Sequence, residues 1–434
     1  EAVAGSIPFS AGIAQEQGGP CAVLAAAQAF LLRRLLFEPL GEPAQKPIED
    51  GWLSEPATVA GCLEPDEPTA IDALLRGLTD ILWHAATTRG VGPPNESSKA
   101  IVALLPPEML PFEGGAPKLI AMLLDHALPA SCWRDVYQGL RARLPALQSP
   151  TGALSFLCSA LLSRGLGPFM AERDDASRPL IDPQFGHCSQ EGLNLLLLGQ
   201  ATSNVFDGER DLGGGLVLRG VASRPAVGLL SELEALRYLQ VGNFFKQPHA
   251  PIWVVASESH YSVLFALTSS VQATDELSAI ERQLEEVFSQ YDAEGNGFIS
   301  GEHLPTLMSA LPQWQLPPLD ELRPQLDPDG TSMLIWDRFQ QVLLPLHPEA
   351  AEALQTRDMA RASNTDVTSF ELLHYNGLGS AGHAHKRALR PITMSPGAFH
   401  GQSAGQPHDG LAAVLQTRWR DACISWDGPP PSIN

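Results

Sequence analysis

Residues 15–36 read Q-E-Q-G-G-P-C-A-V-L-A-A-A-Q-A-F-L-L-R-R-L-L, and this stretch organises the rest of the chain. From position 21 to position 32 it is apolar on every side except at Gln28. A helix with that pattern lies inside a protein, because it has no polar face to turn toward water. Pro20 suits the first helical position, where its missing N–H is not needed. The stretch therefore predicts a central buried helix with Cys21 in its first turn.

Cys21 is the first candidate for chemistry. The unpaired N–H groups and the dipole of a helix N-terminus favour the thiolate, which is the reactive form of cysteine. Gln15, six residues upstream, offers a side-chain NH₂ group of the kind that stabilises an oxyanion. Buried cysteines are also common as inert core residues. The helix start alone leaves a structural and a catalytic interpretation open.

The composition is that of a globular chain with room for two or three domains, or for one large domain with an insertion. It has 434 residues, of which 44% are hydrophobic, and no run of about 18 apolar residues that predicts a membrane span. The formal charge of −21 disfavours nucleic acid and anionic membranes as partners and favours basic ones. The six cysteines include no C-x-x-C pair, which is typical of a reducing compartment. We expect a cytoplasmic or nuclear protein.

Hydrophobic periodicity and turn residues indicate an α+β fold class. We predict helices at 70–88, 98–105, 119–147 with an interruption at Pro129, 153–165 and 189–200, and buried strands at 251–256, 260–266 and 369–374. The Gly-, His- and Ser-rich stretch 377–408 predicts a mobile loop. We assign 1–277 and 349–434 to the two parts of one core, and 278–348 to an insertion between them.

A histidine downstream of Cys21 is needed to complete a thiol hydrolase site. A cysteine at a helix N-terminus followed by a histidine on a distant strand is the order found in papain-like enzymes. His260 fits this role by its place in a predicted strand. His374, in the run L-L-H-Y-N-G at 372–377, is an alternative base. Asn376 could orient either histidine, and the sequence leaves these alternatives open.

Residues 278–348 contain two helix–loop–helix units. Their loops, D-A-E-G-N-G-F-I-S-G-E-H at 292–303 and D-P-D-G-T-S-M-L-I-W-D-R at 327–338, have EF-hand spacing. Four side chains occupy oxygen-ligand positions of the first loop: Asp292, Glu294, Asn296 and Ser300. The position of the bidentate carboxylate that calcium requires is taken by His303 in the first loop and Arg338 in the second. We expect no functional calcium binding, and a folded platform for an unknown protein partner.

Six blocks extend the pattern over almost the whole chain. They are Q…G-G-P-C-A-V-L from Gln15, P-L-I-D-P at 179–183, S-N-V-F-D-G at 203–208, E-A-L-R-Y at 234–238, P-I-W-V-V…S-E-S-H at 251–260 and H-Y-N-G-L at 374–378. Together they resemble the MINDY family of deubiquitinases, in its branch with an EF-hand-like insertion. The resemblance implies a papain-like core of the MINDY type.

The same resemblance implies residue roles and a substrate. It makes Cys21 the nucleophile, His260 the base and Gln15 the oxyanion donor, acting on isopeptide bonds in polyubiquitin, with a preference for chains linked through ubiquitin's lysine forty-eight. Five further residues are expected along the substrate groove: Gly18, Gly19, Asn204, Asp207 and Ser259. The implied enzyme requires no cofactor. The rival interpretation is an inactive scaffold that binds ubiquitin or another partner through the insertion.

Overall fold

A computed structural model describes the chain in residues 7–15, 19–37, 62–89, 99–109, 116–182, 184, 186–268, 271, 276–292, 297–311, 314–348, 350–351, 354, 369–378, 388–396, 410–419, 422–427 and 430–433. The chain divides into two compact units. The first unit is Glu1–Ser269 with Ser369–Asn434, and the second unit is Ser270–Thr368. The second unit contains the range 278–348, which the sequence pattern assigned to an insertion, and extends beyond it at both ends.

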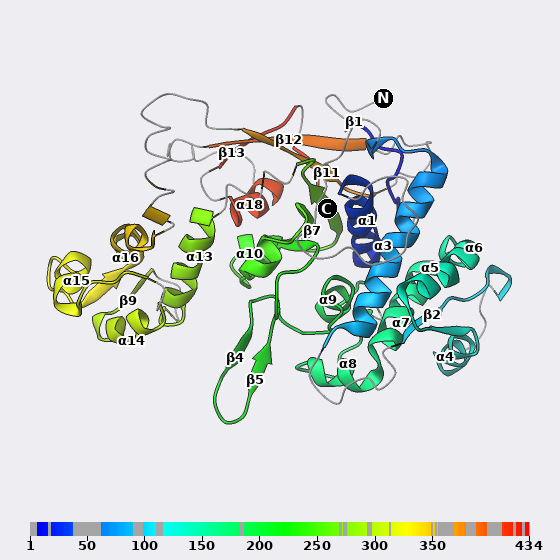
Figure 1. Cartoon of the computed structure of the whole chain (residues 1–434), viewed down its shortest axis with the longest axis horizontal. Coiled ribbons are helices and arrows are strands. Elements are labelled where there is room, and N and C mark those ends of the chain that lie inside the picture. The colour runs from blue at the N-terminus through cyan, green and yellow to red at the C-terminus, as the bar shows by residue number, and fades with distance from the viewer. Residues whose placement is uncertain are drawn as a thin grey trace. The chain divides into compact units, whose positions relative to one another are not determined.

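A seven-stranded sheet forms the centre of the first unit (Figure 1). Its strands lie in the order β1-β12-β11-β8-β7-β6, with β13 also paired to β12. All neighbours are antiparallel except β6 and β7, which are parallel. The strands are β1 (Ile7–Pro8), β6 (Gly228–Ser231), β7 (Ile252–Ala256), β8 (Tyr261–Phe265), β11 (Phe370–Tyr375), β12 (Ala388–Pro396) and β13 (Ala422–Ser425).

The helix α1 (Cys21–Leu36) lies between this sheet and α3 (Glu67–Thr87), as Figure 1 shows. Every residue of α1 except Leu24 is buried, so the prediction of a central buried helix is confirmed. Two of the buried residues are arginines. Arg34 Nε donates to Asp80 Oδ2 at 2.7 Å, and Trp133 Nε1 donates to Asp80 Oδ1 at 2.8 Å. These hydrogen bonds compensate for burying the charges, which are costly without a partner.

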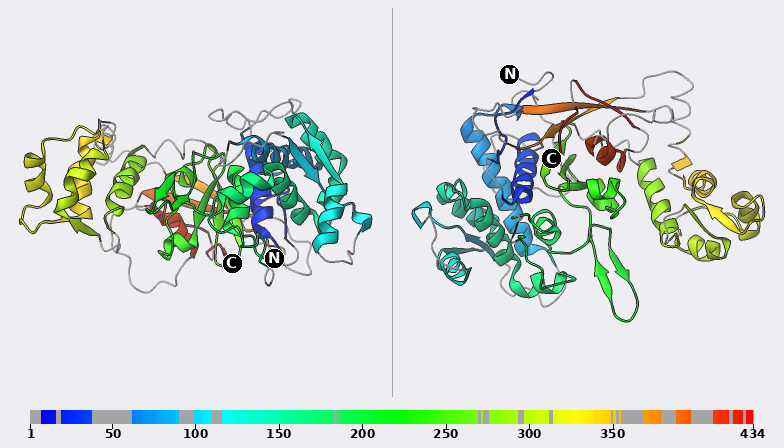
Figure 2. Two further views of the ribbon diagram at one scale, coloured as in Figure 1. Left: turned by 90° about the horizontal axis from the view of Figure 1, so that it is seen from below. Right: turned by 180° about the vertical axis from the view of Figure 1, so that it is seen from behind.

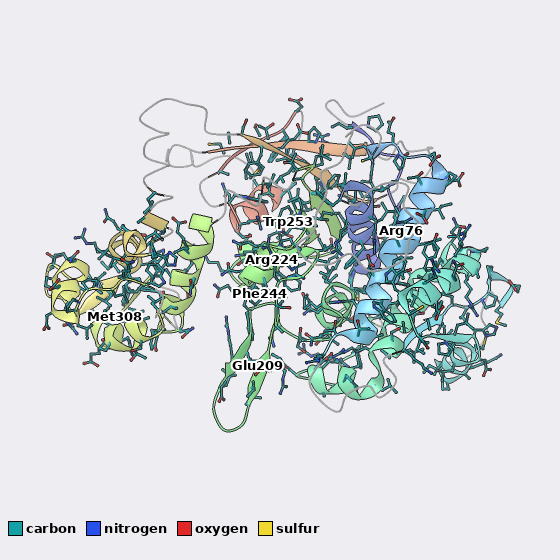
Figure 3. The ribbon with its side chains drawn as sticks, viewed as in Figure 1. Arg76, Glu209, Arg224, Phe244, Trp253 and Met308 are labelled. Atoms are coloured by element: carbon teal, nitrogen blue, oxygen red, sulfur yellow. The ribbon has the colours of Figure 1, made fainter. Side chains whose placement is uncertain are left out.

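Shorter elements complete the first unit, and Figure 2 shows them from two further sides. The helices are α4 (Ala116–Asp125), α5 (Trp133–Ala142), α6 (Leu144–Leu147), α7 (Gly152–Arg164), α8 (Leu166–Glu172), α9 (Gln190–Leu198), α10 (Glu232–Ala235), α11 (Asn243–Lys246), α18 (Gly410–Gln416) and the 3₁₀ turn η1 (Pro107–Met109). Two antiparallel pairs are β2 (Ala100–Ala103) with β3 (Ala127–Ala130), and β4 (Glu209–Asp211) with β5 (Val217–Arg219). The pair β4–β5, which carries Glu209, extends away from the body of the unit (Figure 3).

The predicted helix at 98–105 is wrong, and the predicted helix at 119–147 is wrong in part. Residues 100–103 and 127–130 form the strands β2 and β3. The cause is a contact with α7: its Ser163 and Ser159 hydroxyls accept hydrogen bonds from the backbone N–H groups of Ile101, at 2.7 Å, and Ala103, at 2.9 Å. This tertiary contact overrides the local helical pattern.

The predicted mobile loop at 377–408 is also wrong in part, because its residues 388–396 form β12. This strand pairs with β1, β11 and β13. Leu389, Ile392 and Met394 are fully buried, so the strand belongs to the core. The Gly- and His-rich segments on either side of β12 lie outside the described residues.

The second unit has its own apolar core. Its elements are α13 (Glu276–Ser289), β9 (Phe298–Ser300), η2 (Gly301–His303), α14 (Leu304–Ser309), α15 (Leu319–Leu326), β10 (Met333–Ile335), α16 (Trp336–Leu343) and η3 (Leu344–Leu346). The two loops meet where β9 and β10 pair antiparallel, with Ile299 opposite Leu334. Leu284, Leu304 and Phe339 are fully buried in the centre, and Met308, labelled in Figure 3, packs against them.

In the part of the chain that the structure describes, no single helix is long and apolar enough to cross a membrane. The pair α7 and α8 has the combined length and composition, but it is bent by 93°.

Candidate active site

Cys21 is the first residue of α1, one position earlier in the helix than expected. Pro20 is the N-cap, with φ −76° and ψ 74°, and therefore precedes the helix. The Cys21 N–H donates to the Gly19 carbonyl at 2.8 Å, which closes a tight approach turn. Gly19 has φ +155°, which L side chains rarely adopt. The turn places the Cys21 thiol at the buried end of α1, with only 4% of the residue exposed.

A small cavity of about 20 Å³ brings together the three residues expected to carry catalysis. Gln15, Cys21 and His260 all line it. Four residues of α1 face the cavity at positions 21, 24, 25 and 28, which is the spacing of one helix face. The other walls are Ile13, residues 261–263 of β8 and residues 375–377 at the end of β11.

His260 precedes β8 and is held by a turn and by a neighbouring strand. The Ser257 hydroxyl accepts from the His260 N–H at 3.0 Å. The His260 Nε2 atom lies 2.7 Å from the main-chain oxygen of Asn376. A carbonyl oxygen only accepts hydrogen bonds, so Nε2 carries the ring proton and Nδ1 is the basic nitrogen. This contact therefore fixes the orientation of the His260 ring and the nitrogen that keeps its proton.

His374 is not among the residues that line the cavity. Its Nε2 atom lies 2.9 Å from the Ser262 hydroxyl, and the residue is 1% exposed. Burial, together with the charges of His260 and Arg390, lowers the pKa of His374 to about 3. Cys21 and His260 therefore line one cavity, and His374 lies outside that lining.

Asn376 contacts His260 through its main chain. Its side-chain Nδ2 donates instead to the Ser432 carbonyl at 2.6 Å. The amide side chain at this position was a candidate for orienting the histidine. In the structure the peptide carbonyl makes that contact, which any residue at position 376 could supply.

Three hydrogen bonds hold the segment that carries Gln15. The Ile13 N–H donates to Gln28 Oε1 at 2.6 Å, the Tyr375 hydroxyl donates to the Ile13 carbonyl at 2.9 Å, and the Gln15 N–H donates to the Gly377 carbonyl at 2.8 Å. These bonds attach the segment to α1 and to the end of β11. Sequence reasoning missed Gln28 and Tyr375 as site residues. The signal for Gln28 was its position as the polar exception in an apolar helix.

The electrostatics of Cys21 differ from the expectation. Burial raises the pKa of the Cys21 thiol, and hydrogen bonds from the backbone N–H groups of Tyr261, Ala22 and Cys21 oppose this only in part. The N–H donors at the helix start act in the direction expected from the sequence, but burial has the larger effect. Loss of hydration outweighs the dipole and the N–H donors at this depth.

Cys188 is a second buried thiol close enough to Cys21 to interact with it electrostatically. Burial, with smaller contributions from Cys21 and Glu191, raises the pKa of Cys188 to about 12. Such a thiol is unreactive at neutral pH. Cys188 is buried and is not among the described residues that line the cavity.

Of the five residues expected along a substrate groove, the four that the structure describes do not line the cavity. Asn204 Nδ2 donates to Asp174 Oδ2 at 2.8 Å and to the Arg219 carbonyl at 2.9 Å. The Asp207 carboxylate accepts from the backbone N–H groups at the start of α11, at 2.6 Å for Asn243. Ser259 lies in the turn before His260, and Gly18 lies outside the described residues.

The expected calcium ligands are only partly described. Asp292 Oδ2 accepts from the Gly297 N–H at 2.8 Å, and the Ser300 hydroxyl accepts from the Glu302 N–H at 3.3 Å. Glu294 and Asn296 lie outside the described residues. Within the described ranges, no three His, Cys, Asp or Glu side chains are grouped so that they could hold a metal ion.

Comparisons with known proteins agree with the resemblance. A family model described as "Deubiquitinating enzyme MINDY-3/4, conserved domain" matches residues 6–294. Ubiquitin carboxyl-terminal hydrolase MINDY-3 of Homo sapiens is 33% identical over 431 residues, which cover 97% of this chain and 90% of the human protein. The protein of the same name from Danio rerio is 31% identical over 435 residues, with the same coverage.

A more distant relative matches a shorter region. Probable ubiquitin carboxyl-terminal hydrolase MINDY-4 of Homo sapiens is 36% identical over 264 residues, which cover 59% of this chain and 31% of that protein. No solved structure matches the chain. The family expected from the six sequence blocks is confirmed. The chain belongs to the MINDY-3/4 family of deubiquitinating enzymes.

Proposed function

We propose that this chain is a cysteine-type deubiquitinase that hydrolyses isopeptide bonds in polyubiquitin. Cys21 is the nucleophile, His260 the general base and acid, and Gln15 an oxyanion donor. The observation that carries the proposal is the convergence of these three side chains, from separate segments, on one cavity at the N-terminus of α1. Family membership supplies the substrate class.

In the first half-reaction, His260 Nδ1 takes the proton from the Cys21 thiol as the sulfur attacks the carbonyl carbon at the C-terminus of ubiquitin. The carbonyl π electrons move to the oxygen, where the Gln15 side-chain NH₂ donates to the oxyanion. When the carbonyl re-forms, the C–N bond breaks and the imidazolium gives its proton to the departing lysine amine. A thioester to Cys21 remains.

In the second half-reaction, His260 takes a proton from water, which attacks the thioester carbonyl. Collapse of the second tetrahedral intermediate breaks the C–S bond, releases the C-terminal carboxylic acid of ubiquitin, which loses its proton to solvent, and returns the proton on His260 to the Cys21 sulfur. The raised pKa of Cys21 fits a thiol in the resting state. Proton transfer then accompanies attack, and the contact with the Asn376 carbonyl stabilises the imidazolium as it forms.

Two finer proposals rest on the family. We propose a papain-like core, supported by a nucleophile at the start of a buried helix and a histidine beside an antiparallel sheet. We also propose a preference for chains linked through ubiquitin's lysine forty-eight. Cleavage of a panel of chains with single defined linkages tests that preference, and equal rates on all linkages contradict it.

The second unit is proposed to be an EF-hand-like pair that is stable without calcium. Its second loop is closed by its own groups: Asp327 accepts from the Thr331 and Ser332 N–H groups at 2.8 and 2.7 Å, and Arg338 Nε donates to the Gln325 carbonyl at 2.8 Å. Phe298, Met333 and Ile335 are exposed on β9 and β10. These apolar side chains favour a role as a platform for a protein partner.

A ubiquitin probe with an electrophile at its C-terminus tests the proposed function. We expect the probe to label the wild-type chain at Cys21, and Cys21→Ala to abolish both labelling and cleavage while ubiquitin binding persists. Gln15→Ala is expected to lower turnover by ~10²–10³, the usual effect of losing one oxyanion donor. Binding of ubiquitin without labelling at Cys21 contradicts the enzyme and supports the scaffold. Cleavage by purified Cys21→Ala excludes Cys21 as the nucleophile.

A further inference from the structure

Three amide side chains around the active-site cavity share an unusual feature. Gln15 Oε1, Gln28 Nε2 and Asn376 Oδ1 are all buried, and none has a hydrogen-bond partner among the described residues. All three residues line the same cavity. Buried polar atoms are almost always satisfied by protein or by ordered water. Three such atoms around one cavity point to a shared ligand.

The orientations of two of these amides are fixed by their other ends. Gln28 Oε1 accepts from the Ile13 N–H at 2.6 Å, so Gln28 turns its NH₂ group to the cavity. Asn376 Nδ2 donates to the Ser432 carbonyl at 2.6 Å, which leaves its buried Oδ1 as the atom without a partner. Gln28 is 1% exposed, and bulk water does not reach it. The cavity therefore presents one donor, Gln28, and two acceptors, Gln15 and Asn376.

We infer that this cavity holds one ordered water molecule. A water accepts from Gln28 Nε2 and donates its two hydrogens to Gln15 Oε1 and Asn376 Oδ1, which matches the three atoms in number and in polarity. The volume of about 20 Å³ suits a single water, which requires about 10–15 Å³. A typical buried water makes about three such bonds.

The water has a consequence for catalysis, which rests on the proposed function. Gln15 acts as an oxyanion donor only when its NH₂ group faces the substrate carbonyl. An amide side chain can turn over and present its oxygen instead, which would repel the oxyanion. A water that donates to Gln15 Oε1 fixes that oxygen inside the cavity and directs Nε2 outward. Gln28 and Asn376 are thus positioning residues, which act on the oxyanion through the water and Gln15.

Diffraction from the full-length wild-type chain tests the water directly. At about 1.8 Å resolution or better, we expect a density peak within about 2.7–3.2 Å of the three atoms. Crystals of Asn376→Ala, which keeps the hydrogen bond between Gln28 and Ile13, should lack the peak while the main chain of Ile13 stays in place. A direct bond between Gln28 Nε2 and Gln15 Oε1, or a cavity without a peak, overturns the inference. This result does not depend on whether the chain cleaves ubiquitin.

Kinetics on lysine-forty-eight-linked polyubiquitin test the consequence. Gln28→Met and Asn376→Ala each remove one partner of the water, from different elements. Each variant should lower kcat by about tenfold, which is less than the ~10²–10³-fold loss of kcat expected when an oxyanion donor is removed. KM should stay within about twofold of the wild-type value. Gln200→Met, the same change at a site outside the cavity, is the matched control and should leave both constants unchanged.

A double-substitution experiment separates positioning from general weakening. In a Gln15→Ala background, Gln28→Met and Asn376→Ala should cause almost no further loss of kcat, because the group that they position is gone. Full additive losses in that background overturn the positioning role. If the wild-type chain itself does not cleave the chains, the proposed function fails, and the diffraction result still decides the water.

Discussion

The His260 Nε2 atom donates to the main-chain oxygen of Asn376 across 2.7 Å. The contact follows from the sheet, because β8 and β11 are antiparallel neighbours with Val263 opposite Tyr375. His260 precedes β8 and Asn376 follows β11. Because the two strands are antiparallel, these two residues lie at the same end of the strand pair. The tautomer of the proposed base is therefore set by backbone register, and the identity of side chain 376 does not affect it.

The two histidines should differ sharply in kinetics. We expect His260→Ala to lower kcat by ~10²–10⁴, the usual contribution of a general acid and base. His374→Gln, which can still hydrogen-bond to Ser262, should change kcat by less than about tenfold. Steady-state cleavage of polyubiquitin by both variants, each checked for folding by circular dichroism, provides the comparison. The reverse order of effects contradicts our assignment of the base.

The raised pKa of Cys21 predicts slow reaction with a small alkylating agent. Only the thiolate reacts, and a pKa above the ordinary value lowers the thiolate fraction at every pH below it. Alkylation of Cys21 by iodoacetamide should therefore be slower at pH 7 in the folded chain than in the urea-unfolded chain, with the exposed Cys132 and Cys423 as controls for access of the reagent. Peptide mass spectrometry measures all three in one sample. Alkylation of Cys21 that is as fast in the folded chain as in the unfolded chain contradicts this prediction.

His374 predicts a loss of stability in mild acid. In the folded chain its pKa is about 3, compared with an ordinary value of 6.5. Between these values the unfolded chain binds one more proton than the folded chain, so the free energy of unfolding falls as the pH falls. The expected slope is about 1.4 kcal/mol per pH unit from this residue. Urea unfolding of wild type and His374→Gln at pH 7, 6 and 5 isolates the contribution of His374. If the free energy of unfolding changes with pH by the same slope in both chains, His374 makes no such contribution.

Calcium should have little effect on the second unit. We expect no binding in the ~10⁻⁷–10⁻⁵ M range of sensor loops, because Arg338 replaces the closing carboxylate and bonds to the Gln325 carbonyl. Isothermal calorimetry measures calcium binding. Polyubiquitin cleavage in the presence of chelator measures whether activity depends on calcium. Arg338→Glu combined with Ser332→Gly restores the standard loop chemistry and should bind calcium more tightly than wild type. Micromolar binding by wild type, or cleavage that stops in chelator, identifies the unit as a calcium sensor.

The sequence predicted well those elements whose signal is local. The buried helix α1 follows from an uninterrupted apolar run. Helix α9 follows from its N-cap, since the Ser189 hydroxyl accepts from the Gly192 N–H at 3.3 Å. The strands β7 and β8 follow from β-branched and aromatic residues. Cys21 and His260 stand out for the same reason, because each lies at the boundary of a strongly patterned element.

Long-range contacts produced what the sequence did not predict. Strand β2 depends on hydroxyls of α7 from Ser159 and Ser163. Strand β12 contains Pro391 and lies among Gly- and His-rich residues, yet it is fixed by three neighbouring strands. The hydrogen bond from the Ile13 N–H to Gln28 joins residues that are distant in sequence. The contact of His260 with the Asn376 carbonyl uses a main-chain atom, which the side-chain sequence does not reveal. Neither contact can be predicted from the spacing of residues in the sequence.

The second unit joins the first through β8 and β11, which are adjacent antiparallel strands. The connection leaves one strand and returns to its neighbour, and paired residues of such strands, here Phe265 and Leu373, lie about 5 Å apart. Doubling the length of such a connection adds only about 0.6 kcal/mol of closure entropy. A whole folded module can therefore be gained, exchanged or lost here during evolution without disturbing the strand register that aligns His260.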